Sequence, residues 1–336
     1  MNGKMLALWA GMGAGAFAAV ITDKTGYVTF TATDAGGTSS LVAGGVKHWS
    51  DGLDPHAGAD YLVQGNGNAN WFSASTFLVR TADNGADATF AGDSLTRADG
   101  CLNLKHKASG TFTANWVLYG CRIAAGNVTA GKPATEYNLR LDGPMLVKGT
   151  SANPSCFTGS ANQGVRAMTV ASALTGDADA VVKVCKTPTD GGDSTAYNFR
   201  CCFRGANDAY QGRWRLVGGG SCRYYLDFIG TAAMGTHDGA DGQPLIEVSN
   251  NGWLRCQAVA FTNANHVAAT GNLNVIAVVA GALSERRGSE GAYFAKGFAL
   301  KGDGTGSLNL YASGATVALD DQRPAPGRQR DSHRAP

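Results

Sequence analysis

The sequence predicts an all-β protein built by stacking short strands. From about Phe72 to Leu319, short apolar runs alternate with Gly, Asn and Asp. The runs are too short for helices, and many alternate apolar with polar residues, which is typical of half-buried strands. Examples are CLNLKH, FTANWVLYG, EYNLRL, PMLVKG, RWRLVGGG, LIEVSN and SLNLYASGATVALD.

The composition agrees with a turn-rich β-protein. Gly accounts for 47 of the 336 residues, about twice the usual share. Gly adopts positive φ at no steric cost and therefore suits frequent turns. Charged residues are only 16 %, which does not suit surface helices, and a hydrophobic content of 44 % is enough for a core. The net charge of +2 gives no reason to expect a nucleic acid or an anionic membrane as partner.

The N-terminus has the pattern of a secretion signal. Lys4 precedes an uncharged apolar run from Met5 to Val20, and the residues 16–18, Ala-Phe-Ala, fit a small-x-small cleavage site. The run is shorter than the ~20 residues of a membrane span. The sequence therefore predicts a signal peptide over residues 1–18, a buried core helix being the alternative. We expect a mature chain without a membrane span, either secreted or on the cell surface.

The remaining chain divides by composition into three parts. Residues 19–71 hold two strand-like runs around a long polar turn region, which predicts an N-terminal β cap. Residues 72–320 carry the repeated short strands and form the body. Residues 321–336 are basic, rich in Pro and without an apolar anchor, and we expect them to be disordered.

Eight cysteines permit disulfides in an exported protein, because their number is even. Their spacing does not support zinc, since no C-x-x-C is present. Two pairs, Cys101 with Cys121 and Cys202 with Cys222, are each 20 residues apart. In a coil of about 20 residues, each pair would lie on neighbouring strands at a distance compatible with a disulfide. The alternative is that these cysteines are small buried hydrophobic residues.

One segment carries a family resemblance. Residues 205–220, GANDAYQGRWRLVGGG, place Gly-Ala-Asn, an aromatic residue, Gly, a β-run and a Gly turn in order. This resembles the autotransporter-associated β-strand repeat, with one extra residue before Tyr210. HWSDGLDPHAGADYLV and ATFAGDSLTRADGCLNLKH are similar to the leading segment of bacterial surface proteins with such repeats. The resemblance implies a right-handed parallel β-helix, exported by a Gram-negative-type bacterium as a passenger or adhesin-like stalk. No C-terminal barrel or sorting signal of that family is visible.

Stacked coils need apolar side chains that point inward. One coil cannot bury its inward face alone, so neighbouring coils share a continuous core and pair along their length. We expect Leu102, Leu104, Val117 and Leu118 to point inward and Asn103 to point outward. Five tryptophans are expected to pack at caps or corners, the alternative being a platform for sugar: Trp49, Trp71, Trp116, Trp214 and Trp253.

Histidines and carboxylates crowd one segment of the cap and could hold a divalent metal. Their spacings match no known ligand motif, and Asp and Gly also build turns. The residues are His48, Asp51, Asp54, His56 and Asp60. A weaker version of this pattern lies at His237, Asp238 and Asp241. The segment GDGTG at residues 302–306 is similar to a calcium-binding repeat but lacks its nine-residue period. The sequence therefore predicts no metal site and no cofactor.

The sequence contains no recognisable catalytic motif. G-x-S-x-G, P-loop and H-E-x-x-H patterns are all missing. Some β-helix enzymes cleave acidic polysaccharides with carboxylates and basic residues on adjacent coils, and Asp177 with Asp179 is the best carboxylate pair for such a role. Arg166 and Lys183 are the nearest basic partners along the chain. No residue is predicted to be catalytic.

The sequence is compatible with three functions. The favoured one is a non-enzymatic, exported β-solenoid with a structural or adhesin-like role, whose partners would be surface glycans or other cell-surface proteins. The second is a β-helix lyase or hydrolase that acts on polysaccharides. The third is a carbohydrate-binding β-sandwich, which would gather aromatic residues on one face.

Overall fold

The structure is a computed structural model that describes most of the chain between residues 20 and 313. The described residues are 20–32, 34, 38–65, 87–99, 101–106, 110–127, 138–159, 166–185, 199–218, 224–237, 243–250, 252–257, 259–261, 267–270, 273–278, 292–294, 299–300 and 308–313. The expected signal peptide at 1–18, the expected tail at 321–336 and the GDGTG segment lie outside these ranges.

Three long sheets make up the fold. The seven-stranded sheet contains β1 (Tyr27–Thr29), β2 (Asp60–Gln64), β4 (Ser94–Ala98), β7 (Trp116–Tyr119), β10 (Met145–Val147), β13 (Leu174–Gly176) and β16 (Ala209–Tyr210). The eight-stranded sheet contains β5 (Cys101–His106), β8 (Arg122–Asn127), β11 (Ser155–Gly159), β14 (Val181–Val184), β17 (Arg213–Val217), β19 (Ile246–Ser249), β22 (Val267–Thr270) and β25 (Ala299–Leu300).

The nine-stranded sheet completes the set. Its strands are β3 (Ala88–Thr89), β6 (Gly110–Thr113), β9 (Asn138–Asp142), β12 (Arg166–Val170), β15 (Phe199–Phe203), β18 (Tyr224–Ile229), β20 (Gly252–Gln257), β23 (Leu273–Val278) and β26 (Leu308–Ser313). A small fourth sheet pairs β21 (Val259–Phe261) with β24 (Ala292–Phe294). The helix of the described part is one 3-10 turn, η1 (Thr231–Met234).

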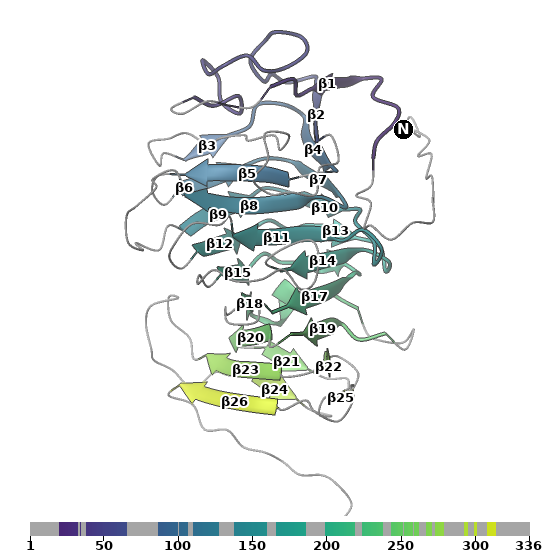
Figure 1. Cartoon of the computed structure of the whole chain (residues 1–336), viewed down its shortest axis with the longest axis vertical. Helices are drawn as coiled ribbons and strands as arrows, with labels where there is room; N and C mark the ends of the chain where they lie inside the picture. The colour runs from purple at the N-terminus through teal and green to yellow at the C-terminus, as the bar shows by residue number, and fades with distance from the viewer. Residues whose placement is uncertain are drawn as a thin grey trace, which may run out of the picture.

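The chain winds from sheet to sheet and forms a parallel β-solenoid. Every named strand pair in the described ranges is parallel, and successive strands within one sheet come from successive coils. Figure 1 shows the coils stacked along the long axis, with β1 and β2 near one end and β26 at the other. The predicted all-β, parallel β-helix is therefore confirmed. A β-sandwich, the alternative, would require antiparallel sheets packed face to face.

The coils are longer and less uniform than the sequence suggested. In the strand register, Cys101 lies opposite Arg122, 21 residues later, whereas Val275 lies opposite Leu310, 35 residues later. A coil of about 20 residues, the condition under which the suggested cysteine pairs would be neighbours, therefore does not hold for most of the stack. The number of residues between paired strands thus differs from coil to coil, while the parallel pairing of the described strands is maintained.

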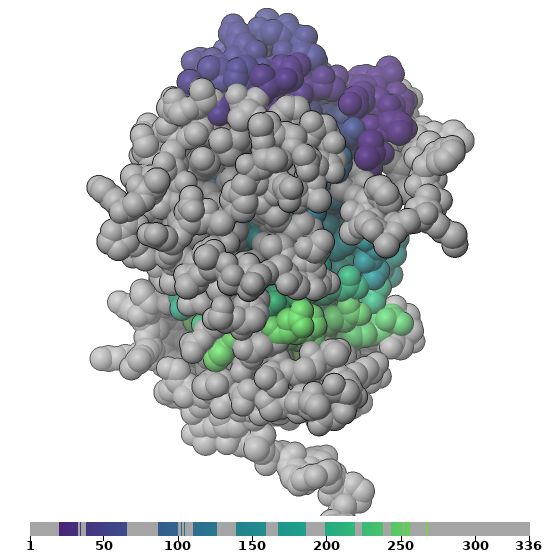
Figure 2. Space-filling model, in the orientation of Figure 1, coloured from purple at the N-terminus to yellow at the C-terminus, as the bar shows by residue number. Residues whose placement is uncertain are grey.

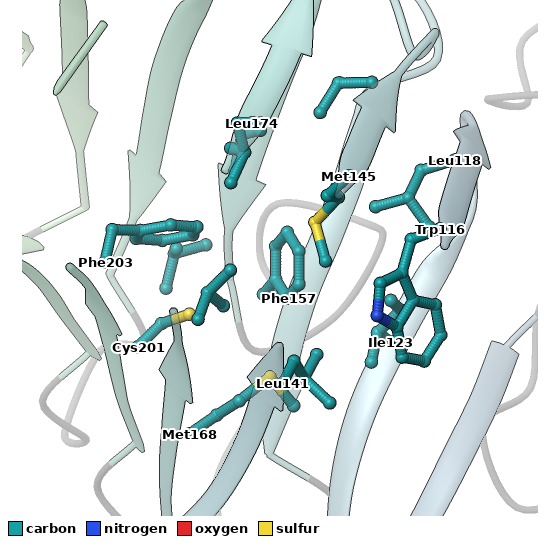
Figure 3. Close-up of a cluster of buried hydrophobic side chains, with 14 of the residues drawn as sticks. Trp116, Leu118, Ile123, Leu141, Met145, Phe157, Met168, Leu174, Cys201 and Phe203 are labelled. Carbon is teal, nitrogen blue, oxygen red and sulfur yellow. The ribbon is translucent and has the colours of Figure 1, made fainter. Parts of the chain in front are cut away.

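The core runs through the centre of the solenoid between the three sheets. Figure 3 shows side chains from all three sheets meeting there, among them Trp116, Met145, Phe157, Met168 and Phe203. Each of these side chains is fully buried. Because each sheet buries only its inward face, apolar residues alternate with outward residues along every strand.

The expected alternation holds where the structure describes it, with one exception. Leu102, Leu104 and Leu118 are fully buried in the core, as predicted. Val117, expected to point inward, is only half-buried, because it lies between the inward Trp116 and Leu118 on the other side of β7. The side chain of Asn103 lies outside the described residues.

The stack already includes the segment before residue 71. β1 and β2 pair in parallel with each other, and β2 pairs in parallel with β4. Trp49 packs edge-to-face on Tyr61, with ring centroids 4.7 Å apart, and so covers the end of the core. Figure 2 shows these first residues, in purple, at one end of the molecule, and residues near 250, in green, toward the other.

The tryptophans have packing roles at most described positions. Trp49, Trp116 and Trp214 belong to the hydrophobic core. Trp253 is 7 % exposed and lies on the outer side of β20. Trp71 lies outside the described residues. The described tryptophans therefore do not gather into an exposed platform for sugar.

A close approach between coils fixes one turn. Gly143 follows β9 with φ of 87° and lies directly below the turn at Ala114 on the preceding coil. A Cβ at this position would meet the Ala114 carbonyl oxygen at 2.3 Å. Glycine is therefore required here for two reasons, the left-handed backbone and the lack of space.

Candidate functional site

The two histidines of the suggested metal segment lie in separate contacts. His48 Nδ1 is 3.2 Å from Asp34 Oδ1, a carboxylate that the sequence reading did not include. His56 Nε2 is 3.5 Å from Asp51 Oδ2. Each imidazole therefore has its own carboxylate partner, and the two pairs do not form one ligand set.

The other carboxylates of that segment hold the backbone and a neighbouring strand. Asp54 Oδ2 accepts a hydrogen bond from the Gly44 amide at 3.1 Å. Asp60 Oδ1 accepts one from the Ser94 hydroxyl at 2.6 Å, across the pair β2–β4. In the described ranges, no three His, Cys, Asp or Glu side chains converge in a way that could hold a metal ion.

The suggested catalytic carboxylates lie on an open turn. Asp177 and Asp179 are both exposed between β13 and β14. Lys183 is 4 % exposed within β14, and the side chain of Arg166 lies outside the described residues. The structure therefore shows no enclosed site that combines these four residues.

A row of polar and charged side chains crosses the outer face of the eight-stranded sheet. The register places Arg122, Cys156, Lys183, Arg215 and Glu247 opposite one another on successive strands from β8 to β19. Their neighbours along each strand belong to the core. Because side chains alternate across a strand, this row faces outward.

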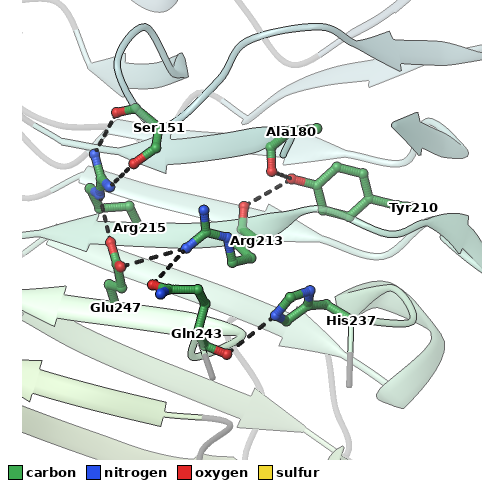
Figure 4. A network of polar contacts seen from close by, with 8 residues as sticks. All are labelled: Ser151, Ala180, Tyr210, Arg213, Arg215, His237, Gln243 and Glu247. Atoms are coloured by element: carbon green, nitrogen blue, oxygen red, sulfur yellow. Dashed lines mark hydrogen bonds and ion pairs between the residues drawn. The ribbon is translucent and has the colours of Figure 1, made fainter. Parts of the chain in front are cut away.

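Arg215 ties three coils of this face together, as Figure 4 shows. Its Nε donates to Glu247 Oε2 at 2.8 Å, on the next coil. Its two terminal nitrogens donate to the carbonyl and the hydroxyl of Ser151, at 3.1 and 2.8 Å. Arg213 approaches the same carboxylate, with Nη1 3.9 Å from Glu247 Oε1. One carboxylate is thus held between two guanidinium groups.

Further contacts fix the backbone under this network. The Tyr210 hydroxyl donates to the Arg213 carbonyl at 2.8 Å and lies 3.4 Å from the Ala180 carbonyl oxygen. His237 lies beside it, with Nε2 3.3 Å from the Gln243 carbonyl oxygen. His237 is buried, while Asp238 and Asp241, its suggested metal partners, lie outside the described residues.

We call this outer surface of the eight-stranded sheet the basic face. Its described charged side chains are four basic groups and one acidic group: Arg122, Lys183, Arg213, Arg215 and Glu247. The outward positions of the nine-stranded sheet carry three basic and two acidic groups: Arg140, Arg200, Arg255, Asp142 and Asp227. In the described residues, positive charge is therefore concentrated on the basic face, although the whole chain carries only +2.

A second polar group, the aromatic–arginine cluster, lies on the outer side of the nine-stranded sheet. The register aligns Arg200, Tyr225 and Trp253 on β15, β18 and β20, and sets Asp227 opposite Arg255. The guanidinium carbons of Arg200 and Arg255 lie 5.3 and 5.7 Å from the centre of the Tyr225 ring. Arg255 Nη1 donates to Asp227 Oδ2 at 3.0 Å.

Asp227 has an unusual environment for a carboxylate. It is 3 % exposed, and its Oδ1 has no hydrogen-bond partner among the described residues. Burial raises the pKa of Asp227 to about 6, although Arg255 and Arg200 act in the opposite direction. The desolvation penalty therefore exceeds the attraction of the two arginines. Burial, with a contribution from Asp227, also raises the pKa of the neighbouring Cys202 to about 12.

The raised pKa of Asp227 predicts a specific pH dependence of stability. Between pH 4 and 6 the folded chain holds a proton on Asp227 that the unfolded chain has released, so stability falls as the pH rises through this window. The loss is roughly 3 kcal/mol for a shift of about two pKa units. In Asp227→Asn this contribution disappears. We expect the difference in unfolding free energy, wild type minus variant, to decline by that amount from pH 4 to pH 7.

Chemical denaturation at a series of pH values measures this difference. Asp177→Asn, on the exposed turn before β14, is the matched control and should give a nearly flat difference curve. A flat curve for Asp227→Asn as well would show that Asp227 does not hold the proton in the folded chain.

The residues that carry the family resemblance have structural roles. Asn207 is fully buried and links three coils. Its Oδ1 accepts from the Leu174 amide of the preceding coil at 2.8 Å, and its Nδ2 donates to the Ala233 carbonyl of the next coil at 2.6 Å. An asparagine is suited to this position because its side chain carries both a donor and an acceptor.

The glycines of the same motif allow coils to approach closely. A Cβ at Gly205 would lie 1.9 Å from the Ser172 carbonyl oxygen, and one at Gly212 would lie 2.4 Å from the Ala180 carbonyl oxygen. Tyr210, between them, is fully buried. The motif Gly-Ala-Asn, aromatic, Gly thus describes how one coil sits on another, and it does not form a ligand site.

The two disulfide pairs that the spacing suggested are not present. Cys121 and Cys202 are buried, and neither is disulfide-bonded. The register is the reason, because Cys101 lies opposite Arg122, one residue beyond Cys121, and Cys202 lies opposite Asp227, five residues beyond Cys222. The alternative, buried cysteines that act as small hydrophobic residues, describes Cys121 and Cys201, which belong to the core.

Comparison with known proteins assigns neither a family nor a function to the chain. No family model matches the chain, and neither a curated protein nor a solved structure gives a significant match. The structure supports the parallel β-helix that the autotransporter-associated repeat implies, and nothing finer. Within the described residues, no helix combines the length and the apolar character that crossing a membrane requires.

The two outer-face groups were not found by sequence reasoning. Each is built from charged or aromatic residues at alternate positions of apolar strands, as in RWRLV, YYLDFI and WLRCQ. That alternation already indicates outward positions. Paired residues on neighbouring coils are 21 to 35 positions apart in the chain. Because this offset varies, the sequence alone does not show that Asp227 lies opposite Arg255.

Proposed function

We propose that this chain is a non-enzymatic β-solenoid that is exported and acts outside the cell or at its surface as a structural, adhesin-like element. The basic face is the observation that supports this proposal. It presents three partly exposed guanidinium groups, those of Arg122, Arg213 and Arg215, on one side of the stack, while its Lys183 is buried. Its arginines are held by contacts between coils, so the charges keep fixed positions without a folding step on binding.

Anionic surface glycans are the partners that fit this face best. Arg213 and Arg215 lie side by side on one strand, partly exposed at 14 and 23 % of their side chains. Guanidinium groups bind carboxylate and sulfate oxygens through paired hydrogen bonds. A polyanion could contact the partly exposed guanidinium groups of this face, whereas Cys156 and Lys183 of the row are buried. The resemblance of residues 205–220 to the autotransporter-associated β-strand repeat, which implies a passenger or stalk, supports the same role.

Binding of the full chain to immobilised polygalacturonate and to uncharged dextran tests this function. We expect binding to polygalacturonate alone, weakening as salt rises because the contact is electrostatic. The double variant Arg213→Gln with Arg215→Gln should lose most of that binding. Arg140→Gln is the control, because Arg140 lies on the nine-stranded sheet and pairs with Asp142 at 2.9 Å. Equal binding by wild type and the double variant would contradict the proposal.

Export is tested separately, through the predicted signal peptide. We expect protein secreted by a Gram-negative host to begin near residue 19, which N-terminal sequencing measures. A secreted chain that still begins at Met1 would contradict the predicted signal peptide.

A polysaccharide-active enzyme is the second candidate, and Asp227 is the observation that favours it. A carboxyl with a pKa near 6 is suited to proton transfer near neutral pH. Arg200 and Arg255 could neutralise a uronate, while Tyr225 and Trp253 could stack on a sugar ring. The members of this cluster are nearly buried, however, so the enzyme is the weaker candidate. Release of unsaturated or reducing sugars from polygalacturonate, abolished in Asp227→Asn, would favour it.

A further inference from the structure

Two cysteines meet on the outer side of the eight-stranded sheet. Cys156 lies in β11 and Cys185 directly after β14, so they belong to adjacent coils. With Val217 they form a small buried cluster, separate from the central core. Their side chains are in contact there and neither is disulfide-bonded, while the Cys156 thiol donates to the Pro154 carbonyl at 3.5 Å. Neither was among the pairs that the sequence suggested.

The neighbouring cysteines face other surroundings. Cys201 points into the central core, and the adjacent Cys202 points outward toward Asp227. Adjacent residues of a strand point to opposite sides, so these two thiols do not face each other. Cys121 belongs to the core as well. Cys156 and Cys185 therefore differ from these three cysteines, because the side chains of Cys156 and Cys185 lie in one cluster on the outer side of the sheet.

We propose that Cys156 and Cys185 are a disulfide-forming pair that staples two successive coils when the protein meets an oxidising environment. In a regular parallel pair, diagonal neighbours begin farther apart than a disulfide allows. Cys185 can make the required shift, because it follows the last residue of β14. Its amide hydrogen bond to the Phe157 carbonyl, at 3.2 Å, is the last ladder contact of this strand among the described residues.

Oxidised glutathione is a sufficient oxidant for this step. The Cys156 thiolate attacks one sulfur of the glutathione disulfide, forms a mixed disulfide and releases one glutathione. Cys185 then loses its proton, attacks the Cys156 sulfur and displaces the second glutathione. Two electrons pass to the glutathione disulfide, and the two protons of the cysteines end on the two glutathione thiols.

The surroundings of the pair make the exchange slow at neutral pH. The contact with Cys156 and then burial raise the pKa of Cys185 well above the usual range, whereas the positive charges of Lys183 and Arg122 act in the opposite direction. Cys156 is 7 % exposed and Cys185 is fully buried. Cys156 is thus the thiol that glutathione reaches first, and a pH near 9 should speed the second step.

The cross-link closes a loop from residue 156 to residue 185. Such a constraint on the unfolded chain stabilises the folded one. We expect the oxidised protein to unfold several degrees higher than the reduced protein. This holds for the purified chain whether or not it binds glycans, so the inference stands apart from the proposed function.

Mass spectrometry of the full chain tests this pair directly. The protein is incubated with oxidised glutathione at pH 9, blocked with an alkylating reagent, and digested without reduction. We expect a peptide that joins Cys156 to Cys185, together with the rise in melting temperature. Cys156→Ser should lose both, and Cys202→Ser, the matched control, should keep both.

Two outcomes would contradict the proposed disulfide between Cys156 and Cys185. One is a digest of the wild-type chain in which Cys156 and Cys185 are both alkylated after incubation at pH 9. The other is a bond from either residue to a different cysteine. Both readouts use the wild-type chain, so they do not depend on whether a variant folds.

Discussion

Leu118→Asp is expected to abolish cooperative folding of the stack. Leu118 is fully buried in β7, between the inward side chains of β4 and β10. A carboxyl group there loses the packing of a core leucine and must be desolvated, and we expect a cost of ~4 kcal/mol or more. The buried Arg97 lies opposite in β4, but its Nη1 already donates to the Val63 and Ala98 carbonyls. Because each coil supports its neighbours, the loss spreads to the coils above and below. Thermal unfolding followed by circular dichroism measures it.

The preceding residue supplies the control for this change. Val117 is half-buried on the outward side of the same strand. Val117→Asp should cost about 1 kcal/mol, mainly through the lower β-propensity of Asp. Equal losses in melting temperature for Val117→Asp and Leu118→Asp would show that the two residues do not face opposite sides of β7.

Asn207→Ala should give the second largest loss. The substitution removes the acceptor of the Leu174 amide and the donor to the Ala233 carbonyl, and both groups are inside the stack. Leaving a buried backbone group without its partner costs ~1–3 kcal/mol, so we expect roughly 2–5 kcal/mol for the two. Asn207→Asp should not rescue the fold, because it keeps only the acceptor and buries a charge.

A matched asparagine separates this role from a general effect of removing an amide. Asn115 is exposed and donates to the Asp93 carbonyl at 2.8 Å. Asn115→Ala should cost less than about 1 kcal/mol, since water can replace the contact. Urea denaturation compares the two variants. A loss for Asn207→Ala no larger than for Asn115→Ala would contradict the link between three coils.

The sequence was sufficient to predict the stack because its signal is local. Alternation around Leu102 and Leu104 and the Gly-rich turns both act within one strand and its turn. The motif Gly-Ala-Asn also indicated the solenoid, and the structure gives its physical basis in the contacts of Asn207 and Gly205.

Features that depend on which residues meet across coils could not be predicted. The number of residues in each coil determines every cross-coil pair, and here the register places Cys101 opposite Arg122 and not Cys121. For the same reason the contact of Cys156 with Cys185 and that of Asp227 with Arg255 were missed. In a parallel stack, loops of variable length separate the partners, and local patterns do not record their length.

The parallel stack is the central claim, and one distance tests it most directly. The row Thr29, Leu62, Thr96, Val117, Leu146, Thr175 and Ala209 runs in register across the whole seven-stranded sheet. Its two ends are separated by six strand spacings, or about 29 Å at ~4.8 Å per strand.

Spin labels introduced at Thr29 and Ala209 through a chemistry that does not use cysteine allow this distance to be measured by pulsed electron paramagnetic resonance. The stack predicts one narrow distribution near that separation, widened only by the label linkers, and a shorter distance when Thr29 is paired with Thr175. A broad distribution, or a distance that does not shorten by about one strand spacing with Thr175, would contradict the continuous parallel stack.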